Sequence, residues 1–233
     1  MRHRARGRLL ALMLLESGAA LAGRPMITDD ARVATAKGCQ VETWIRHTAD
    51  ASEAWAVPAC NPTGNLELAF GGARTREDGE SRFTDNLVQA KTLFRPLTDE
   101  QWGLGISVGT VRHPARATAN GWPGDSYVTL PLSVPVQGGG WIAHFNVGAV
   151  RRRDSGRDLG TWAFANEVRV REGLFVIPEI FRADFGRPFA QAGLRYEVVR
   201  DRMQVSAAIG ERVHGGERWI SLGVSLFSPP FLP

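Results

Sequence analysis

The 233-residue sequence lacks an apolar run that could form a membrane-spanning helix, because charged residues interrupt every window of about 18 residues beyond the amino-terminal stretch. It has only two cysteines, and its net charge is small, since 28 lysines and arginines oppose 24 aspartates and glutamates. It is not poor in glycine or proline, but these residues recur at intervals rather than in low-complexity tracts. Together these features exclude a helical membrane protein and argue against a disordered chain.

The first 22 residues have the layout of a cleavable secretory signal. Four arginines come first, an apolar run covers residues 9–15, and small residues end the stretch at Ala22. Removing these arginines and Glu16 from the totals leaves 24 basic and 23 acidic residues, a net charge of +1. We therefore expect an exported protein, and its basic isoelectric point is no argument for nucleic acid binding.

Most of the mature chain alternates apolar with small or polar side chains in segments of about ten residues, which is typical of an antiparallel β-protein. In residues 102–109, Trp, Leu, Ile and Val alternate with Gly and Ser. In residues 191–198 the second face carries Arg195 and Glu197, whose burial in a small soluble barrel would cost several kcal/mol each unless they were paired. A polar interior is instead typical of a membrane barrel.

The alternation predicts twelve strands, an even number as in bacterial single-chain barrels. They lie near residues 39–48, 51–60, 64–74, 82–93, 101–112, 126–136, 141–151, 160–170, 173–182, 188–198, 202–212 and 217–227. The connections are short on one side and mostly longer on the other, where residues 113–125 form the longest. We therefore predict an all-β fold, an antiparallel up-and-down transmembrane β-barrel of about 12 strands in the Gram-negative outer membrane.

Two further features suit this barrel. Cys39 and Cys60 would face each other in a hairpin with its turn at residues 49–50, and export favours a disulfide between them. Aromatic residues gather toward segment ends, as in interfacial girdles. The residues in question are Phe70, Phe94, Trp102, Trp122, Tyr127, Trp141, Trp162, Tyr196, Trp219 and Phe227.

The chain divides into four predicted segments. These are a signal peptide (1–22), a periplasmic amino-terminal segment (23–37), the barrel (38–227) and a carboxyl-terminal extension (228–233). Residues 23–37 have no strand pattern, and we expect them to cross the periplasmic mouth or to enter the lumen. The prolines of the extension should end the last strand at Phe227.

The predicted inner face carries ionisable side chains of both signs. Two interpretations stay open: a mixed-charge lining that selects solutes, and a salt-bridge network that fills a narrow barrel. The candidate lumen-lining residues are Glu42, Arg46, Glu67, Asp85, Lys91, Glu167, Arg169, Glu179, Arg195 and Glu197, with Gln89 among them.

A basic stretch lies in one of the longer connections. Arg151, Arg152, Arg153 and Arg157 could contact lipopolysaccharide phosphates, since arginine pairs well with phosphate, or could form a solvated loop.

No residue set stands out for catalysis or metal binding. No His is followed two residues later by Ser, no His and Cys are closely spaced, and Asp29-Asp30 lacks the ligand spacing of a calcium loop. We expect no metal, no cofactor and no enzymatic activity, and lipid hydrolysis is disfavoured.

Residues 25–30 read PMITDD, and residues 38–43 read GCQVET at the start of the first strand. This stretch resembles the start of the outer-membrane transporter family associated with the meta-pathway of phenol degradation, and of related uncharacterised barrels. The resemblance implies an outer-membrane location and passage of small, often aromatic, molecules. Residues 222–227, LGVSLF, resemble the terminal strand by which the barrel assembly machinery recognises such proteins.

We therefore expect a passive channel or transporter for small molecules, aromatic ones among them, with outer-membrane lipid, lipopolysaccharide and the barrel assembly machinery as partners. Two alternatives stay open. One is a closed structural or surface-interaction barrel without transport, and the other is a soluble exported β-barrel that binds a ligand.

Overall fold

The computed structural model describes residues 26–77, 80–113, 124–136, 140–183 and 186–233. The predicted signal peptide, residues 1–22, lies outside these ranges and stays a prediction. Among the described residues, no helix is long and apolar enough to cross a membrane.

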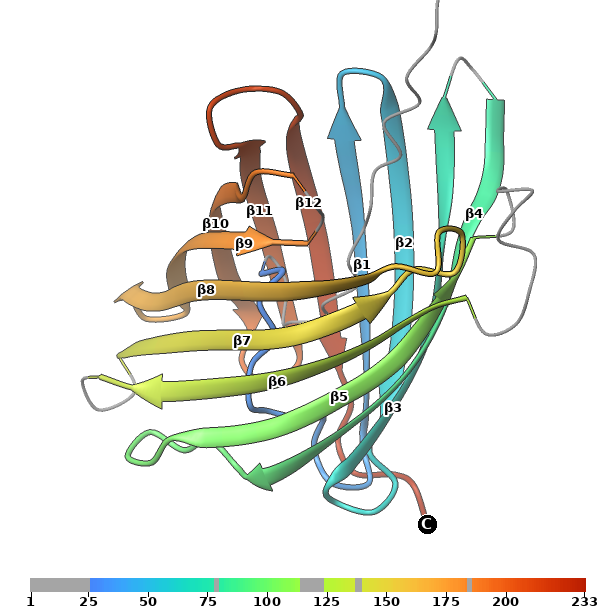
Figure 1. Ribbon diagram of the computed structural model, residues 1–233. Helices are drawn as coiled ribbons and strands as arrows, with labels where there is room; N and C mark the ends of the chain where they lie inside the picture. Colours follow the sequence, from blue (N-terminus) through green and yellow to red (C-terminus); the bar gives the residue numbers. More distant parts are fainter. Residues whose placement is uncertain (1–25, 78–79, 114–123, 137–139, 184–185) are drawn as a thin grey trace, which may run out of the picture.

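Twelve antiparallel strands form a closed barrel in which each strand pairs with its neighbours in sequence and β1 pairs with β12 (Figure 1). This confirms the predicted fold, and the strand ends fall within three residues of the predicted ones. The strands are β1 (Cys39–Thr48), β2 (Ala51–Cys60), β3 (Leu66–Glu77), β4 (Glu80–Arg95), β5 (Gly103–Arg112), β6 (Asp125–Pro135), β7 (Trp141–Arg151), β8 (Asp158–Arg171), β9 (Leu174–Arg182), β10 (Phe189–Val199), β11 (Met203–Arg212) and β12 (Arg218–Phe227).

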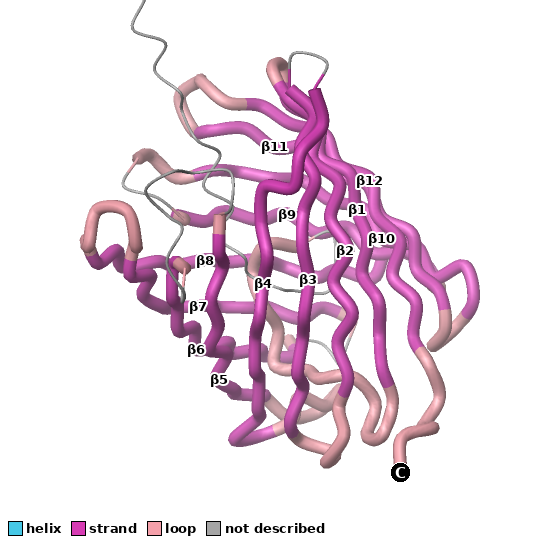
Figure 2. The backbone as a smooth tube through the Cα atoms, turned by 90° about the vertical axis from the view of Figure 1, so that its right-hand side faces the viewer, coloured by secondary structure: helices cyan, strands magenta, loops and turns pink. Residues whose placement is uncertain are grey.

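The outer surface of the barrel is apolar. Large side chains such as Ile45, Phe70, Ile209 and Leu222 are more than half exposed. So much exposed apolar surface suits contact with lipid and not with water, so it argues against the soluble alternative. Figure 2 shows one face of this wall, with β4, β3 and β2 side by side.

Three prolines lie in the interior of strands of the wall, and a fourth, Pro135, ends β6. Pro58, Pro131 and Pro178 belong to β2, β6 and β9, and the pairing with β3, β5 and β8 is interrupted beside them. On its other side each proline keeps a paired partner. Because proline has no N–H to donate, each strand loses pairing on one side only, and the barrel stays closed.

The two ends of the barrel differ. We call the end with Cys39, the residue 61–65 turn and the carboxyl terminus the Cys39 end, and the opposite end, with the residue 49–50 turn, the loop end (Figure 1). At the Cys39 end, Cys39 and Cys60 form the predicted disulfide. The carboxyl-terminal extension returns to this point, since Ser228 N donates to Cys39 O at 2.8 Å and Phe231 N donates to Lys37 O at 2.8 Å. The last strand ends at Phe227, as predicted.

The interior is not polar throughout. Trp44 and Trp55 stack with ring centroids 5.4 Å apart inside the barrel, and Phe181, Phe189 and Trp219 form a second buried cluster. Trp219 was expected in an outer girdle, and that expectation is wrong.

Tyr127 also points inward, where its hydroxyl donates to Gln89 Oε1 at 2.5 Å. Trp122 lies outside the described residues, and Phe227 is half-buried. The remaining predicted girdle residues are exposed: Phe70, Phe94, Trp102, Trp141, Trp162 and Tyr196.

Candidate functional site

We call residues 26–37 the lumenal segment. Residues 26–34 lie inside the barrel, and residues 35–37 are exposed (Figure 1). Met26, Thr28 and Ala31 are fully buried although they belong to no strand. Of the two places expected for the amino-terminal stretch, the structure shows the lumen for these residues, and residues 23–25 lie outside the described ranges. The segment bonds to β9 at its start and to β4 and β5 at Asp29, so it crosses most of the lumen.

The amino-terminal end of the lumenal segment is held by Glu179 of β9. Ile27 N donates to both carboxylate oxygens at 3.0 Å, and Thr28 donates through its backbone N and through Oγ1, the latter at 2.5 Å. Gln191 Nε2 also donates to this carboxylate at 3.1 Å. Charge-assisted hydrogen bonds of this kind are among the strongest in proteins, so Glu179 acts as a firm anchor.

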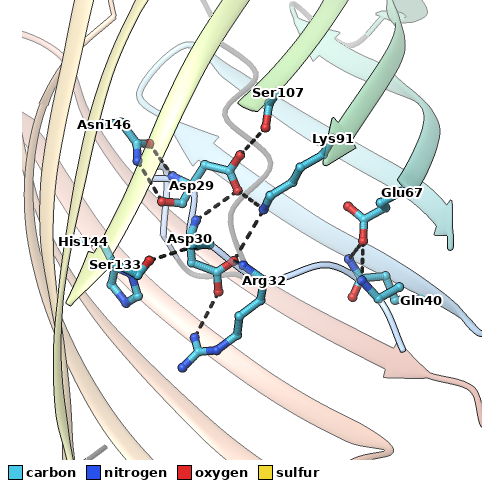
Figure 3. Close-up of polar contacts among 12 residues, drawn as sticks. Asp29, Asp30, Arg32, Gln40, Glu67, Lys91, Ser107, Ser133, His144 and Asn146 are labelled. Carbon is cyan, nitrogen blue, oxygen red and sulfur yellow. Dashed lines mark hydrogen bonds and ion pairs between the residues drawn. The ribbon is translucent and has the colours of Figure 1, made fainter. Parts of the chain in front are cut away.

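Asp29 lies at the centre of the polar network (Figure 3). Its carboxylate accepts from Lys91 Nζ at 2.6 Å and from Ser107 Oγ at 2.7 Å. Asn146 bonds the Asp29 backbone twice, accepting from its N at 2.6 Å and donating to its O at 2.8 Å. Three strands, β4, β5 and β7, therefore hold one residue of the segment.

The next charged residues form a chain of ion pairs. Arg32 lies 3.0 Å from Asp30 and 3.5 Å from Glu167, and Glu167 lies 2.9 Å from Arg195 Nη2. Burial opposes ionisation of Asp30, but the charges of Lys91 and Arg32 outweigh it and hold the pKa of this carboxyl below its ordinary value. Asp30 therefore stays ionised at neutral pH.

Two contacts hold the rest of the segment. Ala31 N donates to Ser133 Oγ at 2.9 Å, and this hydroxyl also bonds His144 Nδ1 at 2.8 Å. Ala34 N donates to Glu67 Oε2 at 2.7 Å. The main chain of the segment is thus bound by side chains of the wall rather than by strand pairing.

The structure places most of the predicted lumen residues on the inner face. Glu42, Glu67, Asp85, Gln89, Lys91, Glu167, Glu179 and Arg195 are buried there. Arg46, which lies 2.5 Å from Glu217 and stacks over Trp219, and Glu197 are half-buried. Arg169 is exposed, with its guanidinium 5.7 Å from the Phe175 ring centroid.

The list of lumen residues predicted from the sequence lacked the uncharged wall residues that bind the lumenal segment. It also lacked the residues of the segment itself. Ser107, Ser133, His144 and Asn146 alternate with apolar residues, and that alternation could have identified them. No pattern in the sequence marks Asp29 as the residue that binds Lys91.

Two cavities flank the segment. The one toward the Cys39 end has a volume of about 350 Å³, and its lining includes seven acidic and four basic residues. The one toward the loop end has about 60 Å³ and is bounded by Ile27 of the segment. It is lined by apolar and aromatic side chains together with His113, Asp125 and Arg152. The lumenal segment therefore separates a larger charged space from a smaller one of mixed character.

A second polar network lies at the loop end. His113 bonds Asp85 through Nδ1, and its Nε2 lies 3.4 Å from Asp125. Arg152 lies 2.7 Å from the same Asp125. Arg152 is therefore turned into the barrel and away from the outer surface.

The other members of the predicted basic loop stay outside. Arg151 is exposed and lies 3.2 Å from Asp158, while Arg153 and Arg157 are exposed beside it. Three of the four arginines expected to contact lipopolysaccharide are therefore exposed, and the contact stays a prediction for these three.

Chemistry beyond binding has little support in the site. Within the described ranges, no group of three or more His, Cys, Asp or Glu side chains could hold a metal ion. Ser133 and His144 form a Ser–His pair, but both are fully buried and the hydroxyl is bonded by Ala31. A second pair, His47 and Ser52, bridges β1 and β2 at 2.7 Å.

A family model described as uncharacterised conserved protein UCP029691 matches residues 10–227. No curated protein matches the chain. Membership of the phenol meta-pathway transporter family therefore stays a prediction.

Solved structures of outer-membrane barrels share the fold. The KdgM porin has a TM-score of 0.61 at 7% identity and covers 80% of this chain and 98% of its own. The NanC porin has 0.60 at 11% identity, covering 81% and 98%. The COG4313 outer membrane channel from Pseudomonas putida F1 has 0.57 at 11% identity, covering 85% and 98%. These neighbours are porins and channels, and the chain shares their barrel fold.

Proposed function

We propose that this chain, which belongs to the uncharacterised conserved family just described, is a passive channel for small solutes in the Gram-negative outer membrane. The observation that carries the proposal is the charged cavity of about 350 Å³ inside a barrel with an apolar outer surface. A polar lumen within a lipid-facing wall is the arrangement that lets water-soluble molecules cross a membrane. The lumenal segment would then limit the conductance.

Aromatic molecules are part of the proposed solute range. The resemblance of residues 25–30 and 38–43 to the phenol meta-pathway family supports them, and so do Phe175 and Phe227 in the lining of the cavity. Lipopolysaccharide phosphates are the proposed partners of Arg151, Arg153 and Arg157 at the loop end.

A second candidate is a closed barrel without transport. The observation that favours it is the tight binding of the lumenal segment, because buried ion pairs such as Lys91–Asp29 fill the central lumen. A hydrolase is less favoured, because the Ser133–His144 pair is fully buried and its hydroxyl is bonded by Ala31.

The test begins with the full chain expressed in a Gram-negative host. A folded barrel should be in the outer-membrane fraction and should migrate differently before and after boiling on a denaturing gel. Purified protein in liposomes is then exposed to neutral sugars of increasing size. The channel proposal predicts swelling that slows as the sugar grows, whereas swelling no faster than in protein-free liposomes would favour the closed barrel.

A further inference from the structure

The lumenal segment is an irregular, bent stretch of chain that the barrel wall binds mainly through its backbone. Ile27, Asp29, Ala31 and Ala34 each donate a backbone N–H to a wall side chain, at distances from 2.6 to 3.0 Å. The acceptors come from four different strands: Glu179, Asn146, Ser133 and Glu67. Backbone groups are common to all peptides, so these acceptors do not depend on the sequence that they bind.

One position of the segment is recognised through its side chain. Lys91, 3% exposed, and Ser107, 1% exposed, both bond the Asp29 carboxylate. Without a carboxylate at this place, the Lys91 ammonium would lose its nearest counter-charge in a buried position, which is costly. The wall is therefore complementary to an acidic residue at one point of the bound peptide.

The wall also accommodates a basic residue, Arg32, three positions after Asp29. Arg32 lies 3.5 Å from Glu167, whose Oε2 accepts no hydrogen bond within the described residues. The cavity of about 350 Å³ adjoins Asp30, Arg32 and Ala34, so this part of the segment borders open space. A peptide bound here has room at one side to enter and leave.

We propose that the lumen is a binding site for short peptides that carry an acidic residue, and that the lumenal segment is its tethered occupant. The inference rests on the proposed channel function and names a solute class for it. A tethered segment has an effective concentration of about millimolar or more, so a free peptide binds appreciably only when the tethered one is removed or weakened.

The test uses a full-length variant in which residues 26–34 are replaced by the same number of Gly and Ser residues, called the Gly–Ser variant. Its segment keeps the backbone donors but is more flexible and lacks the Asp29 carboxylate that Lys91 and Ser107 bind, so the wall binds it more weakly. Its folding is checked by the migration shift before boiling. The probe is a fluorescent synthetic peptide with the sequence of residues 26–34, MITDDARVA. Fluorescence anisotropy measures its binding, and single-channel recording measures its effect on conductance.

We expect the peptide to bind the Gly–Ser variant and to reduce its conductance. A peptide with Asn in place of the residue that corresponds to Asp29 should bind about tenfold more weakly, because it loses a charge-assisted hydrogen bond. Adding Lys91→Met to the Gly–Ser variant should abolish this preference, so that both peptides bind equally. A lumen that binds peptides non-specifically would not show this coupling between the peptide's acidic residue and Lys91.

The outcomes separate the two proposals. A conducting Gly–Ser variant that neither binds the peptide nor distinguishes Asp from Asn overturns the peptide site and leaves the channel intact. A non-conducting variant that binds the peptide with the Asp preference refutes the channel and retains the site.

If the Gly–Ser variant does not fold, the full-length Asp29→Ala variant takes its place. In this variant Lys91 has no Asp29 carboxylate to bond, so it can bond the added peptide. The peptide should therefore bind this variant severalfold more tightly than it binds the wild-type chain. Equal binding to both proteins would overturn the proposal.

Discussion

The two ends of the lumen are built differently, although the same twelve strands line both. Toward the Cys39 end, charged side chains surround a cavity of about 350 Å³ and contact the lumenal segment. Toward the loop end, aromatic rings and the His113–Asp85–Asp125 network leave only about 60 Å³. Alternation along the strands alone determines which side chains face the lumen. The size and charge of those side chains then determine whether the lumen is filled or open.

The largest expected effect on stability and conductance is at Lys91, which lines the charged cavity and bonds Asp29 of the lumenal segment. Lys91→Met leaves Asp29 and Asp30 without their nearest buried cation. Breaking a buried pair in this way should cost about 3–5 kcal/mol of stability and loosen the segment, which raises conductance. Urea unfolding in detergent and bilayer recording measure the two effects.

The matched control is Lys37→Met, since Lys37 is the other lysine and is exposed. Equal losses from both substitutions would show that the Lys91 pair contributes little.

Substitutions in the buried Trp44–Trp55 pair should change stability and not conductance. Trp44→Ala removes one ring of the stacked Trp44–Trp55 pair and leaves a cavity inside the barrel. We expect a loss of about 3 kcal/mol in the free energy of unfolding, with unchanged ion conductance. Trp102→Ala, on the exposed outer surface, is the control and should cost much less. A conductance increase in Trp44→Ala would contradict the separation of the two regions.

The disulfide should have a smaller effect, confined to the Cys39 end. It links residues 21 apart and lies next to the carboxyl-terminal end of the lumenal segment, where Lys37 N donates to Asn61 O at 2.7 Å. Replacing both cysteines by serine should cost about 2 kcal/mol, because the unfolded chain gains freedom. Thermal unfolding of both proteins without reductant measures the difference. No change in the midpoint would mean that strand pairing alone holds this hairpin.

The smallest effect expected is acid sensitivity of the lumenal segment. Because the folded state holds the pKa of Asp30 below its ordinary value, this carboxyl contributes stability that is fully present above the ordinary value of about 3.9. The contribution is lost as pH falls through the lower folded pKa. Stability should therefore fall below about pH 4, by less in Asp30→Asn than in the wild-type chain. Parallel pH profiles would refute a role for Asp30.

The strands could be predicted because period-two alternation determines the faces, and the two cysteines determine the register of the first hairpin. Cys39 pairs with Cys60, and Arg195 and Glu167 meet on the inner face. Trp219 and Tyr127 were misplaced because an aromatic residue near a strand end suits a girdle as well as a core. Only the register distinguishes the two.

The lumenal segment could not be located from local pattern. Its position depends on contacts with residues far along the chain, such as Asp29 with Lys91 and Thr28 with Glu179. The inward turn of Arg152 has the same cause, since its partner Asp125 belongs to another strand. Long-range pairing of this kind leaves no periodic signal in the sequence.

The central claim is that the lumenal segment limits passage through an otherwise channel-like barrel. The most direct test is to record single-channel conductance of the wild-type chain and the Gly–Ser variant in the same planar bilayers, at the same salt concentration. The account predicts a severalfold larger conductance for the Gly–Ser variant. Equal conductances from two folded proteins would contradict it.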